Sequence, residues 1–141
     1  MNIYYKIFIS YTLRDEKISY DLLFRLKNIL SNISTIETFI DVIDNKNIIS
    51  PQEEVFYKLK SADAVWVINS YNLNQSKWVL SELALAKELM KPIYYIEFPQ
   101  VLRLVEIGDL NKLKKHVNKY LPVRDKIAAP TKIEYNLNLR G

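Results

Sequence analysis

Four short runs of apolar residues recur at regular intervals along the chain, and they constrain the fold more than any other feature of the sequence. The runs lie at residues 5–10, 36–41, 64–69 and 93–96. The third run, Ala64-Val65-Trp66-Val67-Ile68-Asn69, is apolar without alternation, as expected of a strand that helices cover on both faces. The four runs therefore predict four β-strands.

The segments between these runs are predicted to be helical. Between the first two runs, the apolar residues that follow a helical period are Ile18, Leu22, Leu26, Ile29, Leu30 and Ile33. Ser50-Pro51-Gln52-Glu53 predicts a helix start, with Ser50 as the N-cap, Pro51 in the first position and Glu53 closing a capping box. We also expect a fifth strand at residues 102–106 and a last helix over residues 110–120.

Strands that alternate with helices pair in parallel through right-handed crossovers. The predicted fold class is therefore α/β, a flavodoxin-like three-layer sandwich with a parallel sheet of four or five strands. In the strand order 2-1-3-4-5, ligands bind beyond the carboxyl ends of the first and third strands. Those ends are Ser10-Tyr11-Thr12 and Asn69-Ser70.

A chain of 141 residues fits one domain, which we expect to occupy residues 1–121. In the tail, residues 122–141, apolar and polar side chains alternate from Ile133 to Leu139. This alternation predicts an additional strand at a sheet edge. A disordered tail is the alternative.

Composition argues against several classes of chemistry. The chain has no Cys, which excludes disulfides, thiol nucleophiles and thiolate metal sites. Neither glycine, Gly108 nor Gly141, lies at a strand-to-helix turn, so there is no phosphate-binding loop. The single His, His116, falls in the last predicted helix, where we interpret it as a surface residue, and this argues against Ser-His-Asp catalysis and a His-rich zinc site. Asp41 and Asp44 could suggest a metal pair, but Asp41 ends the second predicted strand and the residues after it are interpreted as an ordinary polar loop, so we expect no metal and no bound cofactor.

Charge is uneven, because residues 103–141 hold 9 Lys and Arg against 4 Asp and Glu. Lys112, Lys115 and Lys119 follow a helical spacing, which is typical of a solvated helix face. No nucleic-acid-binding module, long apolar segment or secretory signal accompanies them. We therefore expect a cytoplasmic protein that binds neither nucleic acid nor membrane.

Glu82 is the strongest candidate for a functional residue. It borders the apolar stripe that Val79, Leu83 and Ala86 form on a predicted helix. The residues four positions away are Trp78 and Ala86, so Glu82 has no i,i+4 ion-pair partner. Because this helix follows the third strand, topology brings the carboxylate to the ligand-binding edge of the sheet.

A site with one carboxylate, aromatic rings and hydroxyl groups suits the cleavage of an N-glycosidic bond whose leaving group is cationic. An O-glycosidase ordinarily needs two carboxylic groups. The nicotinamide of NAD⁺ departs as a neutral pyridine without an acid, and one carboxylate stabilises the oxocarbenium-like transition state. Tyr11 or Trp78 would stack on a heterocycle.

Four motifs occur in order between residues 4 and 97. They are Phe8-Ile9-Ser10-Tyr11 followed by Asp15, Phe39-Ile40-Asp41, the segment ADAVWVINS at residues 62–70, and the segment SKWVLSEL at residues 76–83. Together they resemble the Toll/interleukin-1 receptor (TIR) domains, especially bacterial ones.

The resemblance implies an NAD⁺ glycohydrolase or cyclase, which releases nicotinamide and either ADP-ribose or a cyclic ADP-ribose isomer. It implies that Glu82 is catalytic, because Trp78 and Glu82 match the Trp-x-x-x-Glu pattern of those enzymes. NAD⁺ is then a substrate rather than a cofactor. The predicted substrate-binding residues are Ser10, Tyr11, Thr12, Asp41, Ser70 and Trp78.

The loop at residues 42–49 departs from the family, since it lacks the Pro-Gly pair and leading Arg common in receptor-type TIR domains. In the family this loop gates the substrate groove or mediates self-association. A lone TIR domain resembles the signal-producing proteins of Thoeris-like phage defence. That likeness implies antiviral signalling, self-association through TIR–TIR contacts and a separate effector protein that the product activates.

Two other functions are compatible with the sequence, one without catalysis and one with a different substrate. A non-enzymatic TIR–TIR adaptor would bind another TIR domain and release no nicotinamide. A nucleoside deoxyribosyltransferase, whose similar α/β domain also uses a Glu on a comparable helix, would release a base from a deoxynucleoside and ignore NAD⁺.

Overall fold

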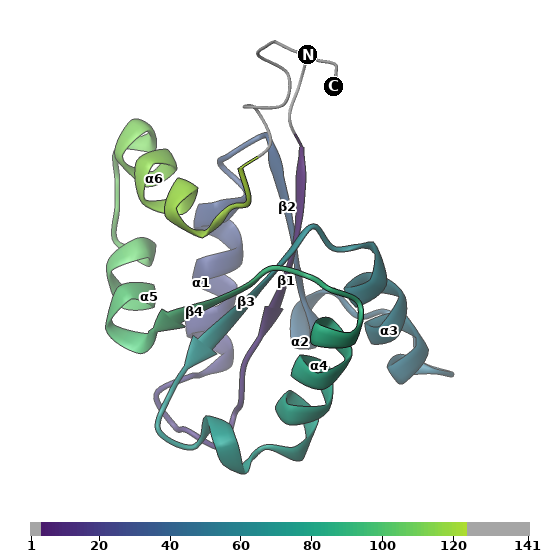
Figure 1. Ribbon diagram of the computed structural model, residues 1–141. Coiled ribbons are helices and arrows are strands. Elements are labelled where there is room, and N and C mark those ends of the chain that lie inside the picture. The colour runs from purple at the N-terminus through teal and green to yellow at the C-terminus, as the bar shows by residue number, and fades with distance from the viewer. Residues whose placement is uncertain (1–3, 124–141) are drawn as a thin grey trace, which may run out of the picture.

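In the computed structural model, which describes residues 4–123, the chain forms a sheet of four parallel strands in the order β2-β1-β3-β4 (Figure 1). The strands are β1 (Tyr5–Ser10), β2 (Ile36–Ile40), β3 (Ala64–Asn69) and β4 (Ile93–Glu97). The predicted α/β class and parallel sheet are confirmed, with four strands among the described residues.

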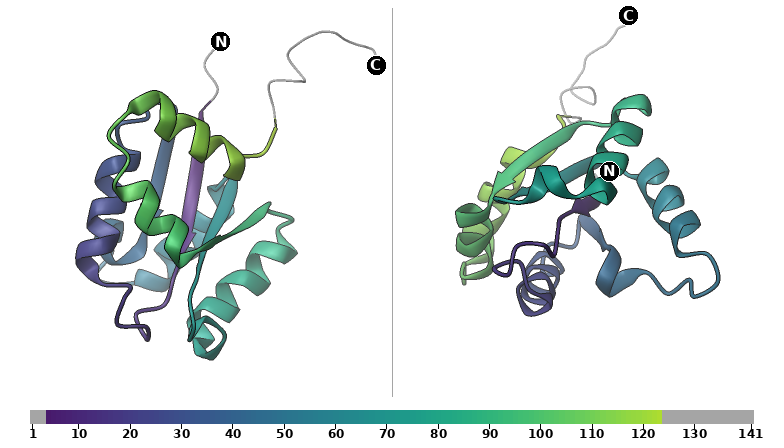
Figure 2. Two further views of the ribbon diagram at one scale, coloured as in Figure 1. Left: turned by 90° about the vertical axis from the view of Figure 1, so that its left-hand side faces the viewer. Right: turned by 90° about the horizontal axis from the view of Figure 1, so that it is seen from below.

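Helices cover both faces of this sheet and make the molecule three layers thick (Figures 1 and 2). One face carries α1 (Tyr20–Leu30), α5 (Phe98–Val105) and α6 (Leu110–Val117), the last followed by the 3₁₀ turn η2 (Asn118–Tyr120). The other carries α3 (Pro51–Ser61) and α4 (Lys77–Glu88), and a 3₁₀ turn η1 (Leu73–Gln75) precedes α4. A short helix α2 (Asp41–Asp44) directly follows β2, so the prediction that Asp41 ends the second strand and that a polar loop follows it is wrong over these residues. The predicted last helix therefore corresponds to α6 and η2.

The buried strands divide their side chains between two cores, as strand geometry requires. On β3, Trp66 and Ile68 pack with α1, α5 and α6, whereas Val65 and Val67 pack with α3 and α4. Because β3 is covered on both faces, a continuous apolar run is the sequence pattern that it needs.

The predicted fifth strand at residues 102–106 is wrong, because this segment belongs to helix α5 and the turn that ends it. Pro99 occupies the first turn of α5, where its missing N–H costs no hydrogen bond. Val101 and Leu104, three positions apart, are the buried residues of the helix, while Leu102 is partly exposed. The apolar spacing is thus helical, and the local alternation around Leu104 is incidental.

Helix starts follow the sequence closely, with one difference in detail. Ser50 is the N-cap of α3 and Pro51 its first residue, but the Ser50 side chain makes no capping hydrogen bond, so the predicted capping box does not form. Ser19 and Ser76 do cap helices, accepting hydrogen bonds from the N–H groups of Leu22 (3.1 Å) and Val79 (3.2 Å).

The segment after α6 is held near the amino end of the sheet. The indole N–H of Trp66 donates to the carbonyl of Tyr120 at 2.7 Å, and the rings of these two residues meet edge to face. The hydroxyl of Tyr5 donates to the carbonyl of Pro122 at 2.9 Å. We call these contacts the C-terminal latch. The tail strand predicted between Ile133 and Leu139 lies outside the described residues.

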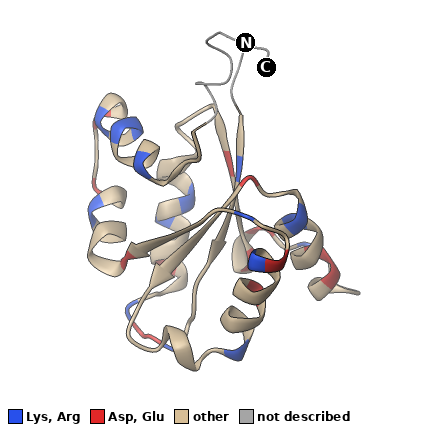
Figure 3. Ribbon diagram, in the orientation of Figure 1, with Lys and Arg blue, Asp and Glu red and all other residues tan. Residues whose placement is uncertain are grey.

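Charged residues are sparse on the strands, whereas Lys and Arg gather along α6 (Figure 3). Lys112 and Lys115 are exposed on α6 and Lys119 is exposed on η2, as predicted for a solvated face, and His116 is half-buried on α6. None of the helices between residues 4 and 123 combines the length and apolar character that crossing a bilayer requires.

Candidate active site

Glu82 is buried in the helix that follows β3. This helix, α4, begins at its N-cap residue Ser76. The buried side chains of Val79, Leu83 and Ala86 pack it against the sheet. Only 7 % of Glu82 is exposed, although a Glu on a solvated helix face would be open to water. The expectation that Glu82 faces inward beside the apolar stripe is therefore confirmed.

The end of β1 meets this carboxylate. Ser10, the last residue of β1 and 1 % exposed, donates a hydrogen bond from its hydroxyl to Glu82 Oε1 at 2.8 Å. Seventy-two positions separate the two residues in the chain. The topological expectation that the carboxyl end of the first strand and the helix after the third strand form one site is thus met by a direct contact.

A cavity of about 520 Å³ opens beside Glu82, and we call it the Glu82 cavity. Its wall comes from the loop after β1, the start of α2 and the first turns of α4, which is the carboxyl edge of the sheet. The predicted residues that line it are Tyr11, Thr12, Asp41, Trp78 and Glu82. Residues that sequence reasoning did not single out are Ile9, Leu13, Arg14, Val42 and Ser76.

Arg14 is the most consequential of the residues missed. It is exposed and supplies the cavity with a cationic side chain, and its backbone N–H donates to the buried hydroxyl of Thr12 at 3.2 Å. The sequence did contain one indication of this role, because Arg14 lies only two residues after the predicted substrate-binding turn at residues 10–12.

Ser70 does not join the Glu82 cavity. It lines a second cavity of about 460 Å³, the Ser70 cavity, together with Arg14, Asp15, Tyr71 and Asn72. Ser70 follows β3, but the chain there turns toward the loop at residues 14–18 rather than toward α4. Its assignment as a substrate-binding residue stays a prediction.

Burial in this cavity raises the pKa of Glu82 to about 7, and the negative charge of Asp41 adds to the increase. The Ser10 hydroxyl, which donates to the carboxylate, and the nearby Trp78 indole act in the opposite direction, because both favour the ionised form. No Lys or Arg within residues 4–123 forms an ion pair with Glu82. Near neutral pH, the carboxylate therefore exchanges between charged and neutral forms, as catalytic carboxyl groups often do.

Tyr11 ties the two loops of the cavity together. Its hydroxyl accepts a hydrogen bond from the backbone N–H of Val42 at 2.9 Å. Burial raises the pKa of the Tyr11 phenol to about 12, so it stays neutral at physiological pH. Its ring also lines the cavity, which is compatible with the stacking role predicted for it.

Asp41 and Asp44 have separate environments. The Asp41 carboxylate lines the cavity and accepts a hydrogen bond from Asn45 Nδ2 at 2.7 Å. Asp44 instead forms an ion pair with Lys27 at 2.8 Å and accepts from the N–H of Ile40 at 2.8 Å. In the described part of the chain, no group of three or more His, Cys, Asp or Glu residues has a metal-binding arrangement.

No protein-family model matches this chain, and no curated protein sequence matches it. The site must therefore be interpreted from its own chemistry. It combines a buried carboxylate of near-neutral pKa, a partly exposed indole and an arginine around a cavity of small-molecule size.

Proposed function

We propose that this protein is an NAD⁺ glycohydrolase or ADP-ribosyl cyclase of the TIR type, with Glu82 as its catalytic residue. The observation that carries the proposal is the buried Glu82 carboxylate in the wall of the 520 Å³ cavity, held by the Ser10 hydroxyl and bordered by the Trp78 ring.

The proposed reaction breaks the bond between ribose C1′ and the nicotinamide nitrogen. The bonding electron pair goes to the pyridinium, which leaves as neutral nicotinamide, and positive charge develops on the ribose. The Glu82 carboxylate stabilises that charge, and it does so strongly because the carboxylate itself is buried. Attack of water at C1′ gives ADP-ribose, whereas attack of the molecule's own adenine gives a cyclic isomer, each with loss of one proton.

Other side chains have supporting roles in this proposal. Ser10 orients the carboxylate through its hydrogen bond, and Trp78, 40 % exposed at the cavity wall, offers a ring for the nicotinamide. Tyr11 holds Val42 in place, so the wall formed by the start of α2 keeps its shape.

We further propose that the enzyme self-associates. Ile48 and Ile49, in the loop between α2 and α3, are 94 % and 96 % exposed, and adjacent isoleucines open to water favour contact with a second copy. The ADP-ribose product, linear or cyclic, would serve as a signal for a separate effector protein in antiviral defence. Concentration-dependent light scattering of wild type and an Ile48→Ser/Ile49→Ser variant tests the self-association.

The decisive experiment is incubation of NAD⁺ with concentrated protein, with products separated by chromatography and identified by mass. Glu82→Gln removes the charge but keeps the shape, and we expect nicotinamide release to fall at least about a hundredfold. Glu88→Gln, an exposed Glu on the same helix, is the matched control and should keep wild-type activity. Equal activity in Glu82→Gln and wild type would remove the mechanism.

Asp41 in the same cavity favours a second candidate, a nucleoside deoxyribosyltransferase. A neutral base needs a proton donor when it leaves, and a pair of carboxyl groups supplies both a nucleophile and an acid. The same assay with deoxynucleosides separates the two candidates, because a transferase releases the base and leaves NAD⁺ intact.

A further inference from the structure

The Ser70 cavity adjoins the Glu82 cavity and is not used by the chemistry proposed above. Arg14 lines both cavities. The second one is formed by the loop after β1, the loop after β3 and the start of α5. Its lining residues are Arg14, Asp15, Glu16, Lys17, Ile18, Ser70, Tyr71, Asn72 and Phe98.

A built contact joins the two loops of this cavity. The Asp15 carboxylate accepts hydrogen bonds from the backbone N–H of Asn72 at 2.9 Å and from Asn72 Nδ2 at 2.8 Å. The nearby Ser70 hydroxyl and the Asn72 backbone N–H hold the pKa of Asp15 below its usual value, because both favour the ionised carboxylate. The loops are therefore fixed relative to each other without a ligand, which lowers the ordering cost of binding one.

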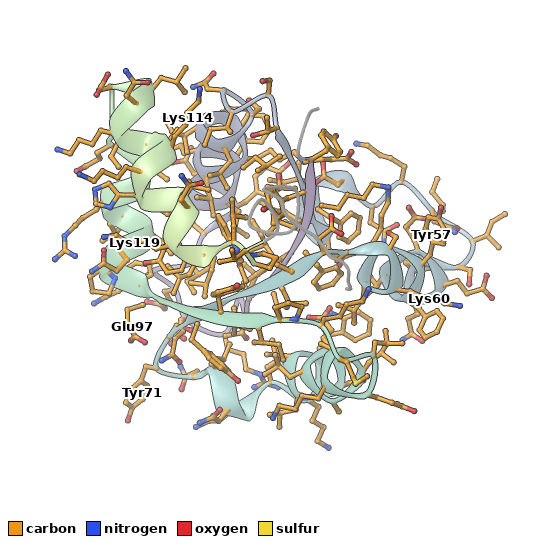
Figure 4. The ribbon with its side chains drawn as sticks, turned by 45° about the horizontal axis from the view of Figure 1, so that its top comes forward. Tyr57, Lys60, Tyr71, Glu97, Lys114 and Lys119 are labelled. Carbon is orange, nitrogen blue, oxygen red and sulfur yellow. The ribbon has the colours of Figure 1, made fainter. Side chains whose placement is uncertain are left out.

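The lining suits a neutral aromatic heterocycle that carries an amine. Arg14 and Lys17 balance Asp15 and Glu16 in formal charge, so the cavity does not select an anion as a whole. Tyr71 lines the cavity with a ring that is 94 % exposed and open to a ligand (Figure 4), and the ring of Phe98 is half-buried at the start of α5. These rings provide stacking surfaces, and the Glu16 carboxylate can accept a hydrogen bond from an exocyclic amine.

We propose that the Ser70 cavity binds the adenosine half of NAD⁺, with Arg14 at the diphosphate between the two cavities. This inference rests on the proposed function and specifies how the substrate lies. Arginine is suited to this position because its guanidinium binds phosphate oxygens in pairs. A dinucleotide that spans both cavities is extended, which keeps its adenine away from ribose C1′. The product is then linear ADP-ribose rather than a cyclic isomer.

Three substrates with the same scissile bond test this arrangement: NAD⁺, nicotinamide mononucleotide and nicotinamide riboside. Tyr71→Ala should lower kcat/KM about tenfold for NAD⁺, the effect of losing one stacked base, and leave the mononucleotide unchanged. Arg14→Gln should lower kcat/KM for NAD⁺ and the mononucleotide relative to the riboside. Tyr57→Ala is the control, because Tyr57 is also exposed (62 %) but lies on α3, away from Tyr71 (Figure 4).

Equal changes for NAD⁺ and the mononucleotide in Tyr71→Ala, or no change in either, would overturn the inference. A cyclic main product from wild type would also overturn it. If wild type cleaves none of the three substrates, the proposed function fails and a binding measurement decides this inference separately. NMR titration with millimolar adenosine monophosphate should then shift the amide signals of residues 14–18 and 70–72 in wild type and Tyr57→Ala, but not in Tyr71→Ala. The absence of such shifts in wild type would refute the site.

Discussion

Asp44 and Glu82 both lie at the carboxyl edge of the sheet, but only Asp44 has a cationic partner among the described residues. Asp44 is fully compensated, because the Lys27 ammonium and the N–H of Ile40 both reach its Oδ2 at 2.8 Å, and Lys27 also donates to the carbonyl of Thr38. Glu82 is more deeply buried and receives a neutral hydroxyl group from Ser10 instead of a cation. The first arrangement fixes the end of β2, whereas the second keeps an unpaired charge at a cost to stability. That difference separates a structural carboxylate from a candidate catalytic one.

The largest expected effect on stability is a gain from Glu82→Gln at high pH. The pKa of Glu82 is about 7 in the folded protein and 4.5 as an ordinary Glu, so the folded state binds the proton more tightly. The stability cost of ionising Glu82 is absent below pH 4.5, grows up to pH 7 and is complete above it. Urea denaturation should show Glu82→Gln more stable than wild type by ~3 kcal/mol at pH 8, and no gain at pH 4. If Glu82→Gln were less stable than wild type at pH 8, the ionised Glu82 would stabilise the fold as Asp44 does, and the proposed difference between them would be wrong.

The pH dependence of catalysis is expected to follow the same group. If the ionised carboxylate stabilises the transition state, kcat/KM for nicotinamide release rises with pH and levels off above about 7. Two pH units below that midpoint, the rate constant should be lower by about a hundredfold. Initial rates between pH 5 and pH 8.5 measure this profile. A rate that falls as pH rises would instead assign Glu82 the role of a proton donor.

Asp44→Asn should act in the opposite direction to Glu82→Gln. It leaves the partly buried Lys27 without its anionic partner, and we expect a loss of about 2 kcal/mol in the free energy of unfolding at pH 7. A double-mutant cycle with Lys27→Met isolates the interaction between the two side chains. Zero coupling in that cycle would show that Asp44 acts through the Ile40 N–H alone.

Asp41→Asn should have the smallest effect of these substitutions, a shift in the pKa of Glu82. The negative charge of Asp41 raises the pKa of Glu82, so its removal should move the midpoint of the pH–rate profile to lower pH. Asparagine keeps an oxygen that can accept from Asn45, which preserves the start of α2. An unchanged midpoint would mean that burial alone raises the pKa of Glu82.

The sequence predicts most of the framework because burial on two faces leaves a readable pattern. The run at residues 64–69 predicts β3, and the missing ion-pair partner of Glu82 beside Val79 and Leu83 predicts its burial. The strand order predicts that Ser10, at the carboxyl end of β1, lies close to Glu82. These features depend on local periodicity and strand order, both of which a single sequence contains.

Features that depend on how loops turn in space are not predicted. Leu102 and Leu104 alternate like strand residues, and only the contacts of Val101 and Leu104 reveal the helix. Ser70 follows β3 as expected, but the direction of its loop is set by the Asp15–Asn72 contact across 57 positions. The link from Tyr11 to Val42 likewise requires knowledge of where two loops meet.

The C-terminal latch has a practical consequence for presenting the protein on a surface. Tyr120 and Pro122 are held by Trp66 and Tyr5 near the amino end of the strands, whereas the residues that line the Glu82 cavity lie at their carboxyl end. An immobilising handle attached directly after Val123, the last described residue, would therefore lie at the end of the sheet opposite the cavity. Protein immobilised through such a handle would keep the Glu82 cavity open to solution, where substrate or a second copy of the protein can reach it.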